Sequence, residues 1–228
     1  MNNMQPQPQI LKEEPGLRME LSCAQREARL QFRQFVGEHI TPHAGRWDRE
    51  ERIPLELIGR LRENGYLGAP LPVEAGGGGL DAITYGLLTE ELARGCSSVR
   101  SLLTVHDMVA LAIWRWGSRE LKTKVGTAAA RAELLCALAL TEPDVGSDAA
   151  GVQTEARAEG DGYVLNGRKK WITYGQIADL FIHGNSMGIS DKQYFSIFSR
   201  RKKTIHHQVG LGPIAAVSFF KPGNQDQK

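Results

Sequence analysis

The sequence predicts an α+β fold, in which an N-terminal all-α helical domain is followed by a partial β-sheet domain. Apolar residues recur at helical spacing from Ser22 to about Ala130. At Leu134 the texture changes to short apolar or alternating runs, which turn residues separate and which are typical of strands. Because the helices all precede the strands, we expect them to form separate layers or domains.

We expect four regions along the chain. Residues 1–20 form a disordered lead-in, and residues 21–132 form the helical domain. The partial β-domain covers residues 133–184, and a divergent tail covers residues 185–228, with one extra strand predicted at 214–220.

Composition and charge limit the classes of partner. Of the 228 residues 41% are hydrophobic and 24% are charged, as in ordinary globular proteins. The net charge of +2 gives no reason to expect nucleic acid or a membrane surface as a partner. We expect a cytoplasmic protein, since the N-terminal segment has no apolar targeting region and no apolar run could span a bilayer. Cys23, Cys96 and Cys136 lack metal-ligand spacing and are interpreted as reduced core residues.

Local start and stop signals define the helices. Ser22 and Gln25 form a capping box for a first helix that runs to His39. Pro54 sits in the first turn of a second helix, Asp81 caps a third, and Ser97 or Ser98 caps a fourth. The fourth helix is apolar nearly all round to Trp116, so we expect it to be central and buried. A short fifth helix follows the Gly117–Ser118 stop and runs to about Ala130.

Four consecutive glycines, residues 76–79, lie between the second and third helices. A phosphate-binding loop is excluded because no strand precedes the glycines and no Lys-Ser/Thr pair follows them. We expect a flexible crossover.

The β-domain is expected to contain strand-like segments at 134–140, 152–158, 163–165, 169–173 and 179–182. The first of these segments is apolar and opens into a loop rich in small and hydroxyl-bearing residues that ends at Asp148. In the predicted strand 169–173, Trp171 and Thr173 would share a face. A flat polar cofactor could approach the backbone of the loop, stack on the tryptophan and hydrogen-bond to the threonine.

Two motifs in this region resemble those of a known family. They are LTEPDVGSD at Leu140–Asp148 and YVLNGRKKWIT at Tyr163–Thr173, and the helical segments precede them in the same order. Over residues 22–182 the chain resembles the flavin-dependent acyl-CoA dehydrogenases. The resemblance implies FAD between a helical and a β-domain, with a C-terminal helical bundle beyond. It also implies α,β-dehydrogenation of an acyl thioester, in which hydride passes to flavin N5.

The resemblance implies roles for residues of the first motif. Leu140 and Thr141 would meet the pyrimidine edge of the flavin, and Gly146 would keep the loop close to the cofactor. Ser147 would bind a flavin phosphate or the pantetheine arm of the substrate, although it could also be a turn residue. Glu142 is expected to shape the loop rather than to act as a catalytic carboxylate.

In the second motif, the resemblance implies that Trp171 packs against the isoalloxazine ring and that Thr173 hydrogen-bonds near N5. Taken alone, Trp171 would be interpreted as strand core, and the Trp-x-Thr context after the first motif reverses that interpretation. No metal site is predicted, since His106 fits a core histidine and His206–His207 have no companion ligand.

Partners also follow from the resemblance. The substrate would be an acyl-CoA, or alternatively an acyl group on an acyl carrier protein. The electron acceptor could be an electron-transfer flavoprotein, and the full-length enzyme would form a homo-oligomer.

After Ile182 we expect the family pattern to fail. The base of the family lies in its C-terminal bundle, so no catalytic residue is assigned here. A truncated or frame-shifted product, a natural short form, an inactive fragment and a subunit completed by another chain all remain open.

Overall fold

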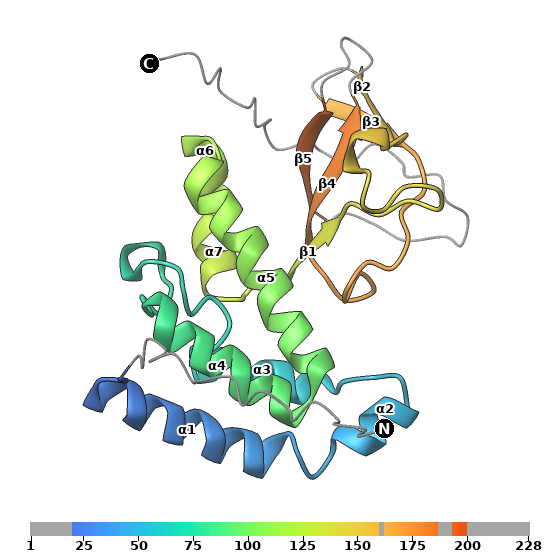
Figure 1. Ribbon diagram of the computed structural model, residues 1–228. Coiled ribbons are helices and arrows are strands. Elements are labelled where there is room, and N and C mark those ends of the chain that lie inside the picture. The colour runs from blue at the N-terminus through green and yellow to red at the C-terminus, as the bar shows by residue number, and fades with distance from the viewer. Residues whose placement is uncertain (1–19, 160–161, 187–192, 200–228) are drawn as a thin grey trace, which may run out of the picture.

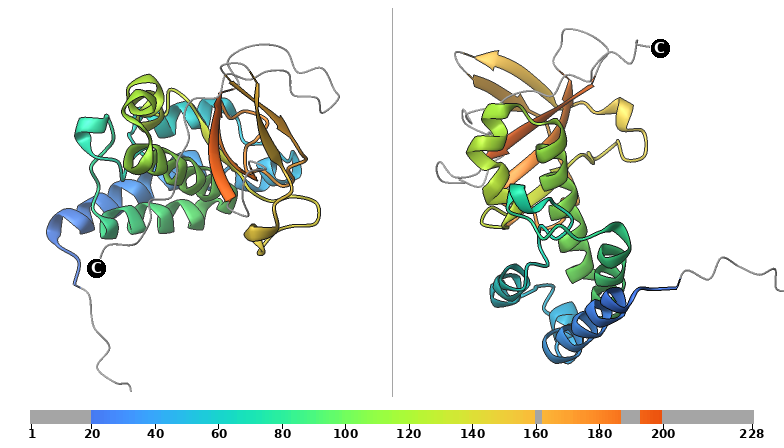
Figure 2. Two further views of the ribbon diagram at one scale, coloured as in Figure 1. Left: turned by 90° about the horizontal axis from the view of Figure 1, so that it is seen from above. Right: turned by 90° about the vertical axis from the view of Figure 1, so that its left-hand side faces the viewer.

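A helical domain and a five-stranded sheet make up the described part of the chain, which confirms the predicted α+β class. The computed structural model describes residues 20–159, 162–186 and 193–199. In Figure 1 the long helices form one layer, the sheet lies beyond them, and α5 runs from the first to the second. The two other views agree with this arrangement (Figure 2).

The helical domain contains α1 (Cys23–His39), α2 (Ala44–Arg49), α3 (Leu55–Glu63), the 3₁₀ turn η1 (Val73–Ala75), α4 (Ala82–Gly95), α5 (Ser97–Trp116), α6 (Arg119–Leu121), the π-helical turn η2 (Lys122–Gly126) and α7 (Thr127–Ala130). The sheet contains β1 (Cys136–Ala139), β2 (Glu155–Glu159), β3 (Gly162–Asn166), β4 (Leu180–Ser186) and β5 (Gln193–Ser199), and the 3₁₀ turn η3 (Ala149–Gly151) lies between β1 and β2.

Capping residues explain where several helices begin. The capping box of Ser22 and Gln25 is present at α1, and Asp81 accepts hydrogen bonds from two backbone N–H groups at the start of α4, as predicted. The predicted caps at Ser97 or Ser98 are wrong, because α5 already includes Ser97 and its N-cap is Cys96, which makes no side-chain capping bond. Pro54 likewise precedes α3 as its N-cap. The short helix α2 was not predicted, since six residues carry too little periodicity.

Two apolar clusters meet along α5. Its N-terminal half, including Leu102 and Leu103, packs into the core of the helical domain. Its C-terminal half, including Ile113, packs with residues of β1 and β4. The helix is central as predicted, but Met108 and Trp116 are 47% and 56% exposed, so it is not buried on all sides.

The cysteines differ in burial, and none of them forms a disulfide. Cys136 is buried in β1, as the core interpretation requires, whereas Cys96 is half-buried. Cys23 is exposed in the first turn of α1, so the core interpretation is wrong for that residue.

The sheet is organised around β4. β5 pairs antiparallel with it along one edge, while β1 and the start of β2 pair parallel with it along the other. β3 extends the sheet by antiparallel pairing with β2. The predicted domain boundary at 184 therefore falls inside β4, and β5 lies in the predicted tail. Residues 214–220 lie outside the described part of the chain.

The glycine run forms a tight ordered turn, so the predicted flexible crossover is wrong. Its backbone N–H groups donate to nearby carbonyls, from Gly78 to Gly68 at 3.2 Å and from Gly79 to Leu71 at 2.8 Å. A Cβ on Gly77 would lie 2.5 Å from the Leu71 carbonyl oxygen. Glycine is needed here because backbone approaches backbone.

Gly68, which anchors this turn, also contacts two other elements. Its N–H donates to the buried carboxylate of Asp107 on α5 at 2.6 Å. Its φ is +77°, and a Cβ there would lie 1.8 Å from the Ala130 carbonyl oxygen. Both its conformation and its surroundings exclude a side chain.

We expect Gly68→Ala to lower the free energy of unfolding by roughly 3 kcal/mol or more, through left-handed strain and overpacking. The matched control is Gly86→Ala in α4, where a Cβ meets nothing within 4 Å. That change should raise stability by about 0.5–1 kcal/mol through helix propensity. Urea unfolding followed by circular dichroism measures both, and equal effects of the two changes would contradict the assignment.

A buried carboxylate joins α1 to α4. Glu91 is 1% exposed and accepts hydrogen bonds from Arg29 at 3.0 Å and from Arg33 at 2.8 Å and 3.2 Å. Arg94 lies 3.9 Å from the same carboxylate. Hydrogen bonds from Arg33 lower the pKa of Glu91 and outweigh the opposing effect of its burial. The hydrogen bonds from the arginines thus compensate the Glu91 carboxylate for its loss of hydration.

We expect Glu91→Gln to destabilise the protein by about 2 kcal/mol, because hydrogen bonds to a charged group are lost in a buried setting. Glu90→Gln is the control, since Glu90 is half-exposed and pairs only with Arg29 among the described residues. Its effect should stay below about 1 kcal/mol. Chemical denaturation at pH 7 compares the two, and a larger loss for the Glu90 variant would refute this account.

Candidate functional site

Two loops of the sheet domain lie against each other and carry the predicted site residues. The first, residues 140–148, follows β1, and the second, residues 167–177, lies between β3 and β4. The Lys170 N–H donates to the Thr141 carbonyl at 2.9 Å. The two sequence motifs are therefore neighbours in space.

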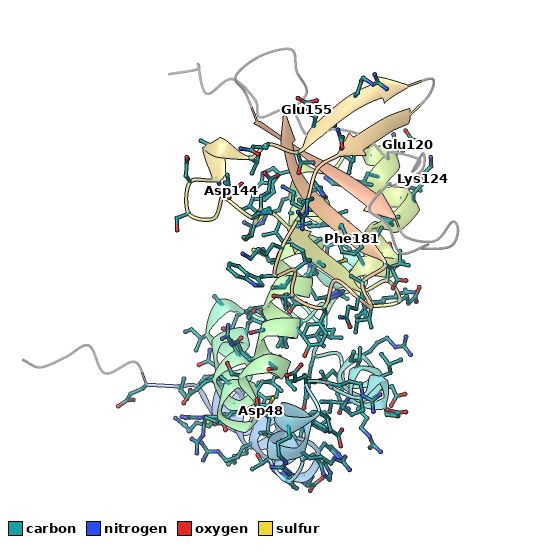
Figure 3. The ribbon with its side chains drawn as sticks, turned by 90° about the vertical axis from the view of Figure 1, so that its right-hand side faces the viewer. Asp48, Glu120, Lys124, Asp144, Glu155 and Phe181 are labelled. Carbon is teal, nitrogen blue, oxygen red and sulfur yellow. The ribbon has the colours of Figure 1, made fainter. Side chains whose placement is uncertain are left out.

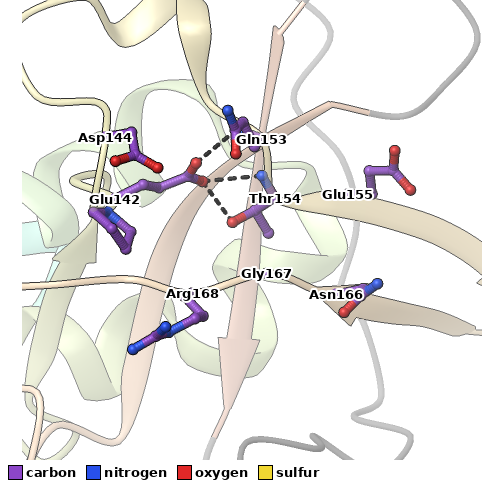
Figure 4. A pocket seen from close by; sticks show the side chains of 9 residues that line it. Glu142, Asp144, Gln153, Thr154, Glu155, Asn166, Gly167 and Arg168 are labelled. Atoms are coloured by element: carbon purple, nitrogen blue, oxygen red, sulfur yellow. Dashed lines mark hydrogen bonds between the residues drawn. The ribbon is translucent and has the colours of Figure 1, made fainter.

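Glu142 joins the first loop to the start of β2. Its carboxylate is 4% exposed and accepts from the Gln153 N–H at 2.6 Å, the Thr154 N–H at 3.0 Å and the Thr154 hydroxyl at 2.6 Å (Figure 4). Lys169 adds a fourth hydrogen bond, at 2.7 Å. Because donors hold both of its oxygens, this carboxylate shapes the loop, as predicted.

Lys169 lies on the inner side of the second loop. Its side chain is 8% exposed, and its ammonium donates both to Glu142 and to the Leu140 carbonyl, the latter at 3.0 Å. Burial alone would raise the pKa of Glu142, but the hydrogen bonds from Lys169, Thr154 and Gln153 outweigh it and lower the pKa to about 2. The Glu142 carboxylate is therefore ionised at neutral pH.

Sequence reasoning did not assign Lys169, although it lies within the quoted motif. Its partner is 27 residues away along the chain. The only local signal was a lysine two residues before the motif tryptophan, and lysines are usually solvated.

Trp171 lies on the outer side of the second loop. Its side chain is 80% exposed, its φ is +56°, and the Lys170 ammonium lies 3.9 Å from the centroid of its ring. The predicted strand at 169–173 is therefore wrong. Residues 167–172 belong to no helix or strand, and a turn begins at Thr173, so a shared strand face for Trp171 and Thr173 does not exist. The left-handed backbone at Trp171 is incompatible with a strand.

The turn after Trp171 contacts the helical domain. The Tyr174 hydroxyl donates to the Ser98 carbonyl at 3.2 Å, and the ring packs against the core of the helical domain. Burial raises the pKa of Tyr174, so the phenol stays protonated. Thr173, next to it, is half-buried. The second loop is thus fixed at the junction of the sheet and the helices.

Gly146 and Ser147 lie on the exposed tip of the first loop. A Cβ on Gly146 would meet nothing within 4 Å, so no contact within the described chain requires glycine there. Leu140 and Thr141, nearer to β1, are half-buried. The bond between Lys170 and Thr141 thus places Thr141 beside the loop that carries Trp171, while Ser147 lies further out on the first loop.

A polar pocket of about 440 Å³ lies behind the first loop. None of the six predicted cofactor residues lines it. Its walls come from both motifs and from β2 and β3: Glu142, Pro143, Asp144, Gln153, Thr154, Glu155, Asn166, Gly167 and Arg168. Figure 3 shows Asp144 and Glu155 in the sheet domain, far from Asp48 of the helical domain.

His106 belongs to the core, as predicted. It is fully buried on α5, its Nδ1 accepts from the Cys136 N–H at 3.2 Å, and burial lowers its pKa to about 4. Among the described residues there is no cluster of His, Cys, Asp and Glu that could hold a metal ion. His206–His207 lie outside those residues. No helix in the described ranges is long and apolar enough to cross a membrane.

Comparison with known proteins finds two domains of one family in the chain. Residues 22–133 match the N-terminal domain of acyl-CoA dehydrogenases, and residues 137–207 match the middle domain. The chain belongs to the acyl-CoA dehydrogenase family. The match to residue 207 corrects the expectation that the family pattern fails after Ile182, which rested on weak strand signals beyond that point.

Relatives and solved structures agree. The chain is 36% identical over 163 residues to a short-chain specific acyl-CoA dehydrogenase of Clostridium acetobutylicum, covering 71% of this chain and 43% of the relative. It is 37% identical over 172 residues to a glutaryl-CoA dehydrogenase of Desulfococcus multivorans, covering 74% and 43%. A glutaryl-CoA dehydrogenase of Mycobacterium smegmatis in complex with FADH2 superposes with a TM-score of 0.74 at 30% identity, covering 88% of this chain and 54% of that one. The chain thus spans about half the length of these proteins, or less.

Acid should selectively remove the contribution of Glu142. Its folded pKa of about 2 lies below its ordinary value of 4.5, so its stabilisation is present above pH 4.5 and is lost as the pH falls towards 2. We expect Glu142→Gln to cost roughly 3 kcal/mol at pH 7 and progressively less below pH 4.5.

Denaturant unfolding at several pH values measures the difference in free energy of unfolding between wild type and Glu142→Gln. Glu120→Gln is the control, since Glu120 pairs with Lys124 on an exposed helical surface (Figure 3), where the change should have a much smaller effect. A gap between wild type and Glu142→Gln that does not change with pH would contradict the assignment.

Proposed function

We propose that the two loops form one wall of an FAD site, in an enzyme that dehydrogenates an acyl-CoA between its α and β carbons. Family membership supports the reaction class, and the Mycobacterium smegmatis structure, with FADH2 bound, supports the cofactor. When bound, FAD supplies the hydride acceptor. The residues of this chain would bind and orient it.

Trp171 is the observation that carries this proposal. The Trp171 side chain is 80% exposed, and its backbone φ is +56°. It therefore buries too little apolar surface within the described chain to offset the strain of that conformation. Left-handed conformations of bulky residues cost on the order of 1–3 kcal/mol and concentrate at ligand sites. A flat ring system stacked on the indole would account for both features.

The other predicted residues fit the same wall. Thr141 is tied to Lys170, next to Trp171, so its backbone and hydroxyl lie beside the indole-bearing loop. We propose that Leu140 and Thr141 meet the polar edge of the flavin and that Thr173 donates near N5. On the exposed loop tip, Gly146 would keep the loop close to the cofactor, and Ser147 would contact a flavin phosphate or the pantetheine arm of the substrate.

The base that removes the α-proton is not assigned to any described residue. The nearby carboxylate, Glu142, is held by donors from β2 and by Lys169. We propose that the base belongs to the part of the relatives that this chain does not match. As electron acceptor we propose an electron-transfer flavoprotein, because the chain superposes with a TM-score of 0.75 and 28% identity on a chain in a structure of the electron transferring flavoprotein of Acidaminococcus fermentans.

The test is a titration of the 228-residue chain with FAD, in which quenching of flavin fluorescence reports binding. Trp171→Gly should weaken FAD binding about 5- to 10-fold by removing the stacking surface. The same change should leave the melting temperature equal or higher, because glycine relieves the left-handed strain.

Trp116→Ala is the control, since Trp116 is an exposed tryptophan at the end of α5 and belongs to neither loop. It should leave the affinity for FAD within twofold. A wild-type chain that binds no FAD at any concentration would refute the proposal, and so would equal losses for the two tryptophan variants.

A further inference from the structure

Lys169 fixes the orientation of one peptide group at the proposed flavin edge. Its ammonium donates to the Leu140 carbonyl at 3.0 Å from the inner side of the loop. The described chain has no cis peptide bond, so the Leu140–Thr141 peptide is trans, and its C=O and N–H point in opposite directions. Holding the carbonyl inward therefore turns the Thr141 N–H away from Lys169.

The Thr141 N–H is the group that this arrangement leaves available. The Thr141 carbonyl is already taken by the Lys170 N–H, at 2.9 Å, and within the described part of the chain no hydrogen bond from the Thr141 N–H is seen. Thr141 is only half-buried. A donor of this kind, unpaired on a partly exposed loop, is suited to an acceptor on a ligand.

Lys169 can hold this peptide because it is itself held. An ammonium carries three donors, and here one of them meets Glu142 at 2.7 Å while another meets Leu140. Glu142 is in turn fixed by Gln153 and Thr154 at the start of β2. The orientation of the peptide is thus fixed by the sheet, through the buried side chains of Lys169 and Glu142. It does not depend on the mobile end of a surface side chain.

We propose that Lys169 is a positioning residue that presents the Thr141 N–H, before any ligand arrives, as a donor to the electron-rich edge of the flavin. This inference rests on the proposed FAD site and adds a residue that acts through the backbone of another. A donor oriented in advance needs no reorganisation on binding, and reduction of the flavin, which adds electron density, strengthens its bond.

The test separates positioning from stability. In the double variant Lys169→Met with Glu142→Gln, both charges disappear together, and exchanging a buried ion pair for neutral groups is often close to neutral for stability. The side chain of methionine cannot donate to Leu140. We expect the melting temperature of the FAD-free protein to fall less than it does in Glu142→Gln alone, the Leu140 carbonyl ¹³C resonance to move upfield, and FAD affinity to fall about 10-fold.

Arg168→Met is the matched control, since it removes a cation from the preceding residue, which is exposed. It should leave the Leu140 resonance unchanged, and it should leave the affinity for FAD within twofold of the wild-type value. Lys169→Arg is the second variant in case the double variant does not fold. It keeps a charge opposite Glu142 but alters the donor geometry, so the Leu140 resonance should shift and the affinity should fall while the fold is kept.

The outcomes distinguish this proposal from the proposed function. An unchanged Leu140 resonance in the folded Lys169 variants overturns the positioning role, whatever FAD does. A shifted resonance with unchanged FAD affinity shows that the peptide is held but does not serve the flavin, which also overturns it. Affinity losses that merely follow the loss of melting temperature indicate a structural role alone. If the wild-type chain binds no FAD, the proposed function fails, and the resonance alone decides whether Lys169 orients the peptide.

Discussion

The buried carboxylate of Glu142 is the constraint on which the sheet domain depends. An ionised group removed from water is tolerated only when donors replace its hydration, and here the donors are Gln153, Thr154 and Lys169. They come from the start of β2 and from the loop after β3. Satisfying one carboxylate therefore brings together segments that the chain order would leave apart, and both family motifs meet at that point.

The helix α5 relates this region to the rest of the molecule. It belongs to both apolar clusters, and midway along it the buried His106 accepts from the backbone of β1. Near its N-terminus the Ser98 carbonyl accepts from Tyr174. The helix thus contacts the first strand and the second site loop. The candidate site lies at the junction because one rigid element positions both of its sides.

Sequence reasoning succeeded where the cause of a structure is local. The caps at Ser22 and Asp81 and the apolar run of β1 depend on residues a few positions apart, and they were predicted. It failed where the cause is distant. The segment 169–173 has a strand-like composition, yet its backbone bonds to the Thr141 loop and turns at Trp171. The glycine run appeared flexible because the contacts that confine it come from residues 68–71.

The failure at Trp171 is informative because of where it falls. Lys169 and Trp171 are two residues apart, and a strand would place them on the same face. The left-handed backbone at Trp171 instead accompanies a buried ammonium and an exposed indole, at 8% and 80% exposure. Lys169 binds Glu142 and the Leu140 carbonyl on the inner side of the loop. The free energy of these bonds offsets the conformational strain at Trp171 on the outer side. A local preference overridden at this cost, with a large aromatic side chain left exposed, is the pattern expected where binding and not folding selects the conformation.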